Sequence, residues 1–266
     1  LDLNHISVRN DDGVAYLEAM SPVDCIFLDP ARRNEHGGKT VAISDCEPNV
    51  AKLEGLLLSK ANRIMIKLSP MLDLSQALKE LPHTQEVHII SVNNECKELL
   101  LLLGQTAPEE IPVHCVNLST KGEQEKQLFV FTREQEQHSE CSYTDTLGNY
   151  LYEPNASLLK AGAFRSIAAA YSVKKLHPNS HLYTSETQIE GFPGRTFRII
   201  NRCSLNKKEI KENLSDLKKA NITVRNFPAT VAELRKRIKL AEGGDTYLFA
   251  STLNDGQKIL IRCGKV

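Results

Sequence analysis

Residues 23–33 form the sequence Val23-Asp24-Cys25-Ile26-Phe27-Leu28-Asp29-Pro30-Ala31-Arg32-Arg33, a short apolar run that stops at Asp-Pro and then turns basic. Such a run, rich in β-branched and aromatic residues, predicts a strand that is buried on both faces, as in parallel sheets. Pro30 has no N–H group and therefore belongs just past the strand end. Asp29 then lies at the carboxyl edge of the strand, where open α/β sheets bind ligands.

Strand and helix patterns alternate on both sides of this stretch. A weak strand pattern at residues 5–8 precedes it, and strands at 63–68 and 87–92 follow it. We expect helices from Pro48 to about Ala61, at 74–81 and at 95–103. Two further strands, at 113–118 and 127–132, flank a polar turn and predict a hairpin. The alternation predicts a parallel sheet with helices on both faces and an antiparallel edge.

The end of the chain has a different order. Its strand and helix patterns run β-α-β-α-β-β from Phe197 to Arg262, which fits a small ferredoxin-like α+β domain. A polar, charged stretch at 133–138 suggests a boundary. We therefore predict an α/β fold in three parts: residues 1–134, a helical and loop linker at 135–195 that looks helical over 154–176, and a ferredoxin-like domain at 196–266.

Charge is unevenly distributed along the chain. Residues 196–266 hold 15 Lys/Arg and 7 Asp/Glu, a net charge of +8, in a chain whose overall net charge is zero. A basic module of this kind is the electrostatic footprint of a phosphate-backbone binder. A solvated, lysine-rich surface explains the same charges. The candidate RNA-binding side chains in this module are Lys207, Lys208, Arg235, Lys236 and Arg237, and Lys218 and Lys219 also contribute to its charge.

Cysteine and histidine patterns give little sign of cross-links or metals. The seven cysteines are an odd number without a CxxC pair, which favours reduced thiols in a cytosolic protein. Pro178 separates His177 from His181, so we predict no metal site. No apolar run approaches the ~20 residues of a membrane span, and no membrane partner is predicted. Because the chain opens on Leu1 rather than Met, we expect a fragment of a longer protein.

Two acidic turns follow successive strand patterns: Asn10-Asp11-Asp12-Gly13 and Asp29-Pro30-Ala31-Arg32. They resemble the third and fourth motifs of class I S-adenosylmethionine-dependent methyltransferases. The resemblance implies that Asp11, Asp12 and Asp29 contribute to the cofactor site. It also implies that Asp29, Pro30 and Arg32 form the catalytic turn that positions the acceptor nucleophile.

Further motifs narrow the resemblance: Lys67-Leu68-Ser69-Pro70, Asn94-Glu95-Cys96-Lys97-Glu98-Leu99, Tyr152-Glu153-Pro154-Asn155 and Val224-Arg225-Asn226-Phe227-Pro228. In this order they are similar to a bacterial group of methyltransferases with a C-terminal THUMP-like domain. The similarity covers essentially the whole chain. It implies a partial Rossmann-like methyltransferase domain at 1–134 and a THUMP-like domain at 196–266.

The glycine-rich first motif of such enzymes is absent, since no Gly-x-Gly occurs in the chain. We expect an N-terminally truncated cofactor site, weak or no S-adenosylmethionine binding, and no activity from this chain alone. Ala31-Arg32 also replaces the Pro-aromatic pair usual in amino-methylating enzymes. Ser69-Pro70 stands where uracil-C5 methyltransferases have a nucleophilic cysteine, which disfavours C5 chemistry.

The favoured function is therefore S-adenosylmethionine-dependent methyl transfer to RNA, with the basic domain docking the substrate. The alternative is a non-catalytic RNA-binding module on a methyltransferase-like scaffold. A hydrolase with Asp29 as nucleophile is weaker, because Ala31 stands where such enzymes place a second acid. The substrate base and the oligomeric state are not predicted.

Each site residue also has a structural explanation. Asp29 fits a turn or a helix N-cap, and Asp11 and Asp12 fit helix capping. Arg32 and Arg33 fit either substrate phosphate or an ion pair that ties the loop to the body. Lys67 fits an ion-pair partner better than a catalytic group.

Overall fold

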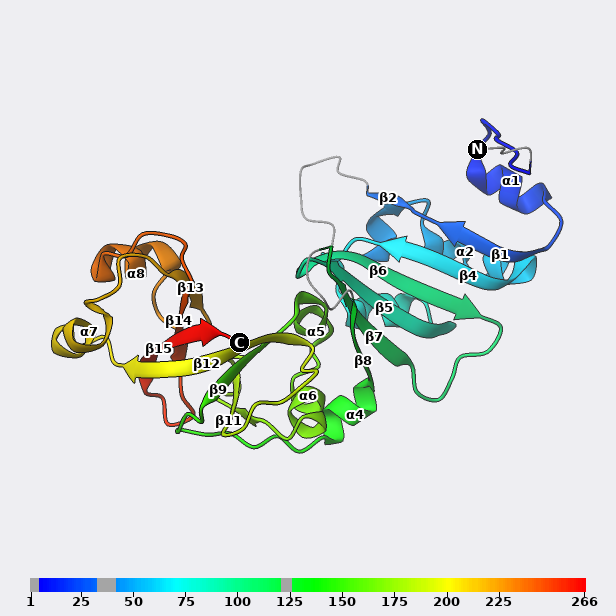
Figure 1. The fold of residues 1–266 in the computed structure, drawn as a ribbon. Coiled ribbons are helices and arrows are strands. Elements are labelled where there is room, and N and C mark those ends of the chain that lie inside the picture. Colours follow the sequence, from blue (N-terminus) through cyan, green and yellow to red (C-terminus); the bar gives the residue numbers. More distant parts are fainter. Residues whose placement is uncertain (1–4, 33–41, 121–125) are drawn as a thin grey trace. The chain divides into compact units, whose positions relative to one another are not determined.

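The computed structural model describes residues 5–32, 42–120 and 126–266 (Figure 1). The chain divides into two compact units, Leu1–Ile90 with Cys96–His114, and Ser91–Glu95 with Cys115–Val266. The predicted boundaries after residues 134 and 195 stay predictions. The described helices are α1 Gly13–Ala19, α2 Val50–Lys60, α3 Leu74–Glu80, α4 Arg133–His138, α5 Ala156–Ala161, α6 Arg165–Ala170, α7 Lys207–Leu214 and α8 Val231–Ile238.

Strands make up two main sheets and one short ribbon. The six-stranded sheet has the order β1-β4-β6-β5-β7-β8, and the seven-stranded sheet has the order β10-β11-β9-β12-β15-β14-β13. The strands are β1 Val23–Leu28, β2 Ala31–Arg32, β3 Cys46–Glu47, β4 Ala61–Leu68, β5 Thr84–Val92, β6 Glu95–Gly104, β7 Pro112–Leu118, β8 Lys126–Thr132, β9 Tyr150–Pro154, β10 Lys174–Lys175, β11 Tyr183–Ser185, β12 Gly194–Cys203, β13 Asn221–Val224, β14 Thr246–Thr252 and β15 Lys258–Lys265.

The predicted parallel pair forms between β1 and β4. Leu28 pairs with Ile66, so both strands end at the same edge of the sheet. Helix α2 packs on β4 and buries Val50 and Leu57. The Lys60 ammonium at the end of α2 donates to two carbonyls at the C-terminal end of the α1 segment, at 2.8 and 2.9 Å. A lysine thus satisfies carbonyls that a helix end leaves unpaired.

One predicted helix is wrong. Residues 95–103 form strand β6, which pairs antiparallel with β4 and makes the sheet mixed rather than parallel. Asn93 and Asn94 separate β5 from β6, and their φ angles are +51° and +64°. A two-residue loop with positive φ at both positions is the type I′ geometry that closes a tight hairpin, and Asn adopts it readily. The leucine run therefore continues as a strand.

Two other predictions about the first unit are also wrong. Residues 5–8 are irregular rather than a strand. Strand β1 is not buried on both faces, because it is an edge strand of the described sheet and Val23 and Phe27 are 42% and 57% exposed. Burial of both faces requires an element packed against each face of the strand, and the exposed side chains of β1 show that its faces are not fully covered.

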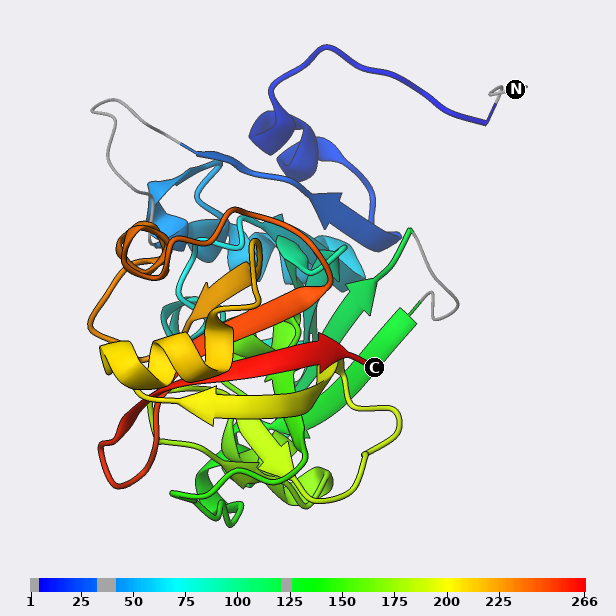
Figure 2. The same ribbon diagram turned by 60° about the vertical axis from the view of Figure 1, so that its left-hand side comes forward.

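The seven-stranded sheet carries one apolar cluster on each face. Figure 2 shows helix α7 (yellow) lying beside strand β12 of this sheet. Phe249 and Ile261 join one apolar cluster, whereas their chain neighbours Leu248 and Leu260 join the other. This alternation is the two-residue period of a strand. Helices α7 and α8 contribute Leu214 and Leu234 to the second cluster. The predicted β-α-β-α-β-β order is confirmed by strands β12 to β15 and helices α7 and α8.

The stretch 135–195, predicted as a linker, contains strands β9 to β11 of this sheet. The long helix expected over 154–176 is replaced by two short helices, α5 and α6, because Gly162 adopts φ +78° and ends α5. Glu136 then accepts hydrogen bonds from the first amides of α6, at 2.8 Å from Arg165 N and from Ser166 N. A carboxylate at this position pairs with the positive end of the helix dipole.

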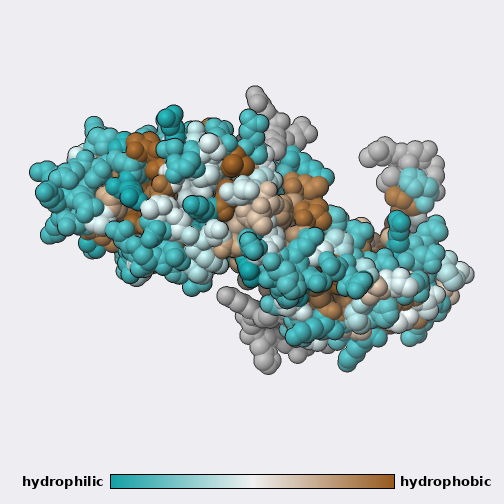
Figure 3. All heavy atoms as spheres, turned by 90° about the horizontal axis from the view of Figure 1, so that it is seen from below, coloured by the Kyte–Doolittle hydropathy of each residue, from teal (hydrophilic) through white to brown (hydrophobic). Residues whose placement is uncertain are grey.

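The surface in Figure 3 is mainly hydrophilic, with apolar side chains in small patches. Ile6, Val8, Phe27, Met71 and Ile200 are among the exposed large apolar residues. Within the described residues, every helix falls short of the length and apolar character that a membrane crossing requires.

His181 makes the second unit sensitive to acid. Burial, helped by the positive charges of Lys175 and Arg225, lowers the pKa of His181 to about 4 from 6.5. The unfolded chain therefore binds this proton before the folded chain does, so the free energy of unfolding should fall as pH drops from about 6.5 to about 4. Denaturant titrations at pH 7 and pH 4.5 measure this loss.

The variant His181→Asn should lose less stability between these two pH values, and Asn tolerates the φ of +52° at this position. The variant His138→Asn, which removes a side chain that is 73% exposed, serves as the control and should behave as the wild type. Equal acid sensitivity of His181→Asn and wild type would contradict the assignment.

Candidate functional site

Asp29 and Lys67 meet at the shared edge of β1 and β4. The parallel register pairs Leu28 with Ile66, so the next residue on each strand, Asp29 and Lys67, lies side by side. The Lys67 ammonium is 2.6 Å from Asp29 Oδ2 and 3.8 Å from Glu98 Oε2 on β6. Residues at or near the ends of β1, β4 and β6 thus place the Lys67 ammonium between the carboxylates of Asp29 and Glu98.

A cavity of about 200 Å³ opens at this edge. Pro30 lines it together with Asp29, and the side chain of Asp29 is 55% exposed. One carboxylate oxygen of Asp29 is engaged by Lys67, and the carboxylate remains accessible to a small polar group. The remaining lining residues are Cys46, Lys67, Leu68, Ser69, Pro70, Leu72, Lys97 and Glu98.

The ammonium of Lys67 is held in its charged form. Its hydrogen bond to Asp29 is the main cause that raises the pKa of Lys67, desolvation opposes this rise, and the charge of Glu98 adds to it. Both partners are exposed to solvent in part, so the pair orients the Asp29 carboxylate more than it stabilises the fold.

The rest of the predicted catalytic turn is only partly described. Arg32 lies in the short strand β2, where it pairs with Cys46 of β3. This ribbon fixes the backbone that leaves the Asp29-Pro30 turn. Arg33, predicted to bind RNA, lies outside the described residues.

Two of the three acids predicted to bind the cofactor, Asp11 and Asp12, make local contacts in the structure. Asp12 is the N-cap of α1, and its Oδ1 accepts from the amides of Val14 and Ala15 at 2.9 Å each. Asp11 pairs with Arg9 at 3.9 Å. Neither side chain lines the Asp29 cavity. The capping explanation thus accounts for Asp12, and the cofactor role of these acids stays a prediction.

The predicted basic residues divide into two groups. Arg235 donates to the carbonyl of Ala220 at 3.2 Å, and Arg237 donates to the carbonyl of Leu205 at 2.9 Å. The second bond brings the end of α8 close to the start of α7. There, Lys207, Lys208 and Lys236 have exposed side chains. The arginines therefore fix the helix ends, and the lysines present charge to solvent.

Sequence reasoning missed Glu98, Lys97 and Cys46 as neighbours of Asp29. The sequence predicts a helix at 95–103, and a helix gives no reason to place Glu98 at the edge of the sheet. The available signal was Asn93-Asn94, a pair that favours the positive φ of a tight hairpin. Cys46 reaches the cavity through a ribbon of two-residue strands, which has no sequence pattern.

A second group of polar residues lines a cavity of about 580 Å³ within the second unit. Gln127 Oε1 accepts from the side-chain amides of Asn155 and Asn117 at 3.0 and 3.2 Å, and Gln127 Nε2 donates to the carbonyl of Gly194 at 3.0 Å. Asn94 Oδ1 accepts from the amide of Ala156 at 2.8 Å. These amides are paired with one another and with backbone, which is typical of a structural network.

Comparisons with known proteins agree with this organisation. Residues 150–193 match the model of a ferredoxin-like domain, and residues 194–265 match the model of a THUMP-like domain. The chain carries a THUMP-like domain. The ferredoxin-like match falls inside the stretch that was predicted as a linker. None of the curated proteins matches the chain.

The crystal structure of a "putative methyltransferase" from Porphyromonas gingivalis W83 is similar to this chain, with 40% sequence identity and a TM-score of 0.83. The similarity covers 91% of this chain and 60% of that structure. These findings confirm the resemblance to a methyltransferase with a THUMP-like domain and the predicted α/β fold class. Because this chain spans about three-fifths of the length of that protein, the activity of the whole protein is a proposal.

The Asp29–Lys67 contact predicts a measurable titration. In the wild type, Lys67 should keep its proton above pH 10.5, its ordinary pKa, whereas Asp29→Asn should bring the Lys67 pKa back towards that value. NMR of ¹³C-labelled lysine side chains measures both. A variant of an acid outside the contact, Asp24→Asn on β1, should leave the titration unchanged, and an unaltered Lys67 pKa in Asp29→Asn would contradict the contact.

Proposed function

We propose that this chain is the acceptor-positioning and RNA-docking part of an S-adenosylmethionine-dependent RNA methyltransferase. The observation that carries the proposal is the Asp29 carboxylate, held at a sheet edge by Lys67 at 2.6 Å and facing a cavity. The similarity to the Porphyromonas gingivalis structure and the THUMP-like domain support it.

Methyl transfer to a nucleophile is an in-line displacement that depends on orientation and desolvation. The cofactor supplies the methyl group. Asp29 accepts a hydrogen bond from the amino group of the acceptor and thereby turns its lone pair towards the donor. Lys67 holds that carboxylate in place, and Pro30 forms a rigid wall of the cavity.

The residues of this chain fit the acceptor half of such a site better than the donor half. Asp12 uses a side-chain oxygen to cap α1, and no Gly-x-Gly segment is present for the methionine end of the cofactor. These residues therefore account for how the acceptor is held, and this chain alone should bind S-adenosylmethionine weakly or not at all.

The proposal is tested in the full-length protein by transfer of a radiolabelled methyl group to RNA. Asp29→Ala should lower the rate about 100-fold, the cost of a misplaced reacting group. The matched control is Asp24→Ala, which removes an exposed carboxylate from the same strand. Equal labelling by Asp29→Ala and wild type, or no labelling by either, would overturn the catalytic proposal.

The RNA-docking role makes a separate prediction about salt. Reversing the three exposed charges in Lys207→Glu, Lys208→Glu and Lys236→Glu should weaken RNA binding. It should also flatten the dependence of log K on log salt by roughly 0.7–0.9 for each phosphate that the protein no longer neutralises. Fluorescence anisotropy with single-stranded RNA at several salt concentrations measures both.

A triple variant with the same change of charge, at the exposed Lys52, Lys79 and Lys126, should bind RNA with the wild-type slope. If both triple variants lose affinity equally, the effect is one of net charge and the docking surface is wrong. RNA binding without any methyl transfer would favour the alternative, an RNA-binding module on a methyltransferase-like scaffold.

A further inference from the structure

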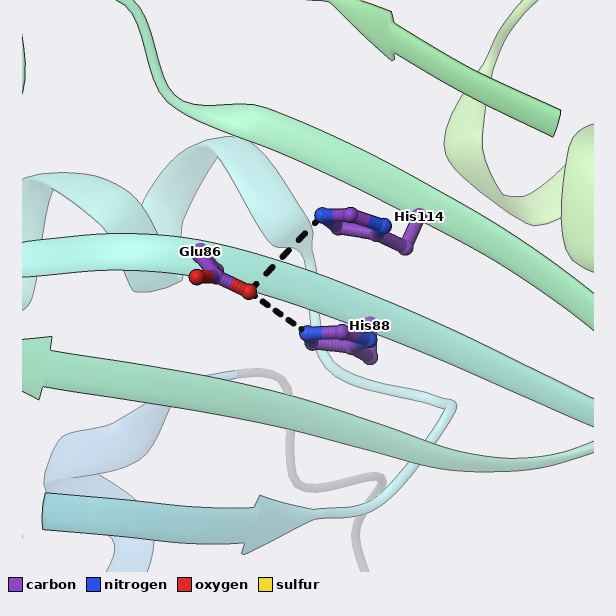
Figure 4. Close-up of side chains that lie close together, drawn as sticks. All are labelled: Glu86, His88 and His114. Carbon is purple, nitrogen blue, oxygen red and sulfur yellow. Dashed lines mark hydrogen bonds and ion pairs between the residues drawn. The ribbon is translucent and has the colours of Figure 1, made fainter.

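Two histidines and one glutamate converge on the sheet of the first unit, away from Asp29. Glu86 and His88 lie two residues apart on β5 and therefore share one face of the strand. His114 lies on β7, the neighbour of β5 in the sheet. Figure 4 shows both imidazole rings directing a nitrogen at the carboxylate of Glu86. Of the residues described, only these three bring such a set of ligand atoms together.

The two rings are stacked, and one nitrogen of each lies beside the Glu86 carboxylate, so the three ligand atoms lie within 4.8 Å of one another. Their centroids are 4.4 Å apart and their planes differ by 8°. Glu86 Oε2 is 3.1 Å from His88 Nε2 and 3.7 Å from His114 Nε2. Ligand atoms bound to one tetrahedral Zn²⁺ at 2.0–2.1 Å are about 3.3 Å from each other. The distance from Glu86 to His88 is slightly shorter than this separation, and the distance from Glu86 to His114 is slightly longer.

Burial and scaffold also suit a metal ion. The histidine side chains are 26% and 25% exposed, and Glu86 is 44% exposed, so an ion and a water molecule can reach the cluster. All three ligands stand on strands, which hold side chains more firmly than loops do. The glutamate supplies the negative charge that offsets part of the charge of a divalent ion.

We propose that Glu86, His88 and His114 form a binding site for a divalent transition-metal ion, with Zn²⁺ as the preferred ion. Two imidazoles and one carboxylate suit Zn²⁺, whereas Ca²⁺ and Mg²⁺ require oxygen ligands throughout. Three protein ligands leave a coordination position for water or a ligand. No sequence pattern indicates this site, because His114 lies far from His88 in the chain and no short motif contains both.

Calorimetric titration of the reduced protein with Zn²⁺ tests the site. We expect one ion per chain in the wild type. Removal of a residue that hydrogen-bonds to a metal ligand lowers metal affinity by about 10- to 100-fold, and removal of a ligand itself should lower it at least as much. We therefore expect His88→Ala, His114→Ala and Glu86→Gln each to bind Zn²⁺ about 100-fold more weakly or worse. Glu86→Gln preserves the size of the side chain, and circular dichroism of each variant establishes that it is folded.

The control is His83→Ala, which removes a histidine that pairs with Glu54 at 3.2 Å and stands outside the group of three ligands. It should bind Zn²⁺ as the wild type does. Titration with Co²⁺ separates the proposed ligands from the seven cysteines, because thiolate ligands add a charge-transfer band and imidazole and carboxylate ligands do not. Absence of binding, a thiolate band, or unchanged affinity in the folded Glu86→Gln and His88→Ala variants would overturn the proposal.

Discussion

The second unit is organised by one buried carboxylate. Glu153 on β9 is 2% exposed, and its oxygens accept from Arg195 Nε and from Arg225 Nη2 at 2.9 Å each. The register of β9 and β12 places Arg195 directly opposite Glu153. A buried charge is strongly unfavourable without partners. The ferredoxin-like and THUMP-like segments must therefore pack so that both arginines reach this one residue.

The Asp29 site is built by a different constraint, the register of two parallel strands. Once Leu28 pairs with Ile66, the acid after β1 and the lysine near the end of β4 lie next to each other without any loop to place them. The ion pair is accessible to solvent and therefore contributes orientation rather than stability.

Sequence reasoning recovered the local features and missed the non-local ones. The Asp-Pro stop after β1, the strand predicted at 63–68, which β4 contains, and the alternation of the last domain all follow from residue type and period. Residues 95–103 were misjudged because a run of leucines fits a helix and a buried strand equally well. The turn at Asn93 and Asn94 and pairing with β4 decided between them.

The sequence by itself determined where strands end, where acids and prolines follow them, and which domain carries the positive charge. These are properties of neighbouring residues, which the covalent chain places together. Only the tertiary structure decided that Lys67 binds Asp29 and that His88 and His114 share one carboxylate. The physical reason is that the contacts at Asp29 and Glu86 join strands distant in sequence, and their register depends on the packing of the whole sheet.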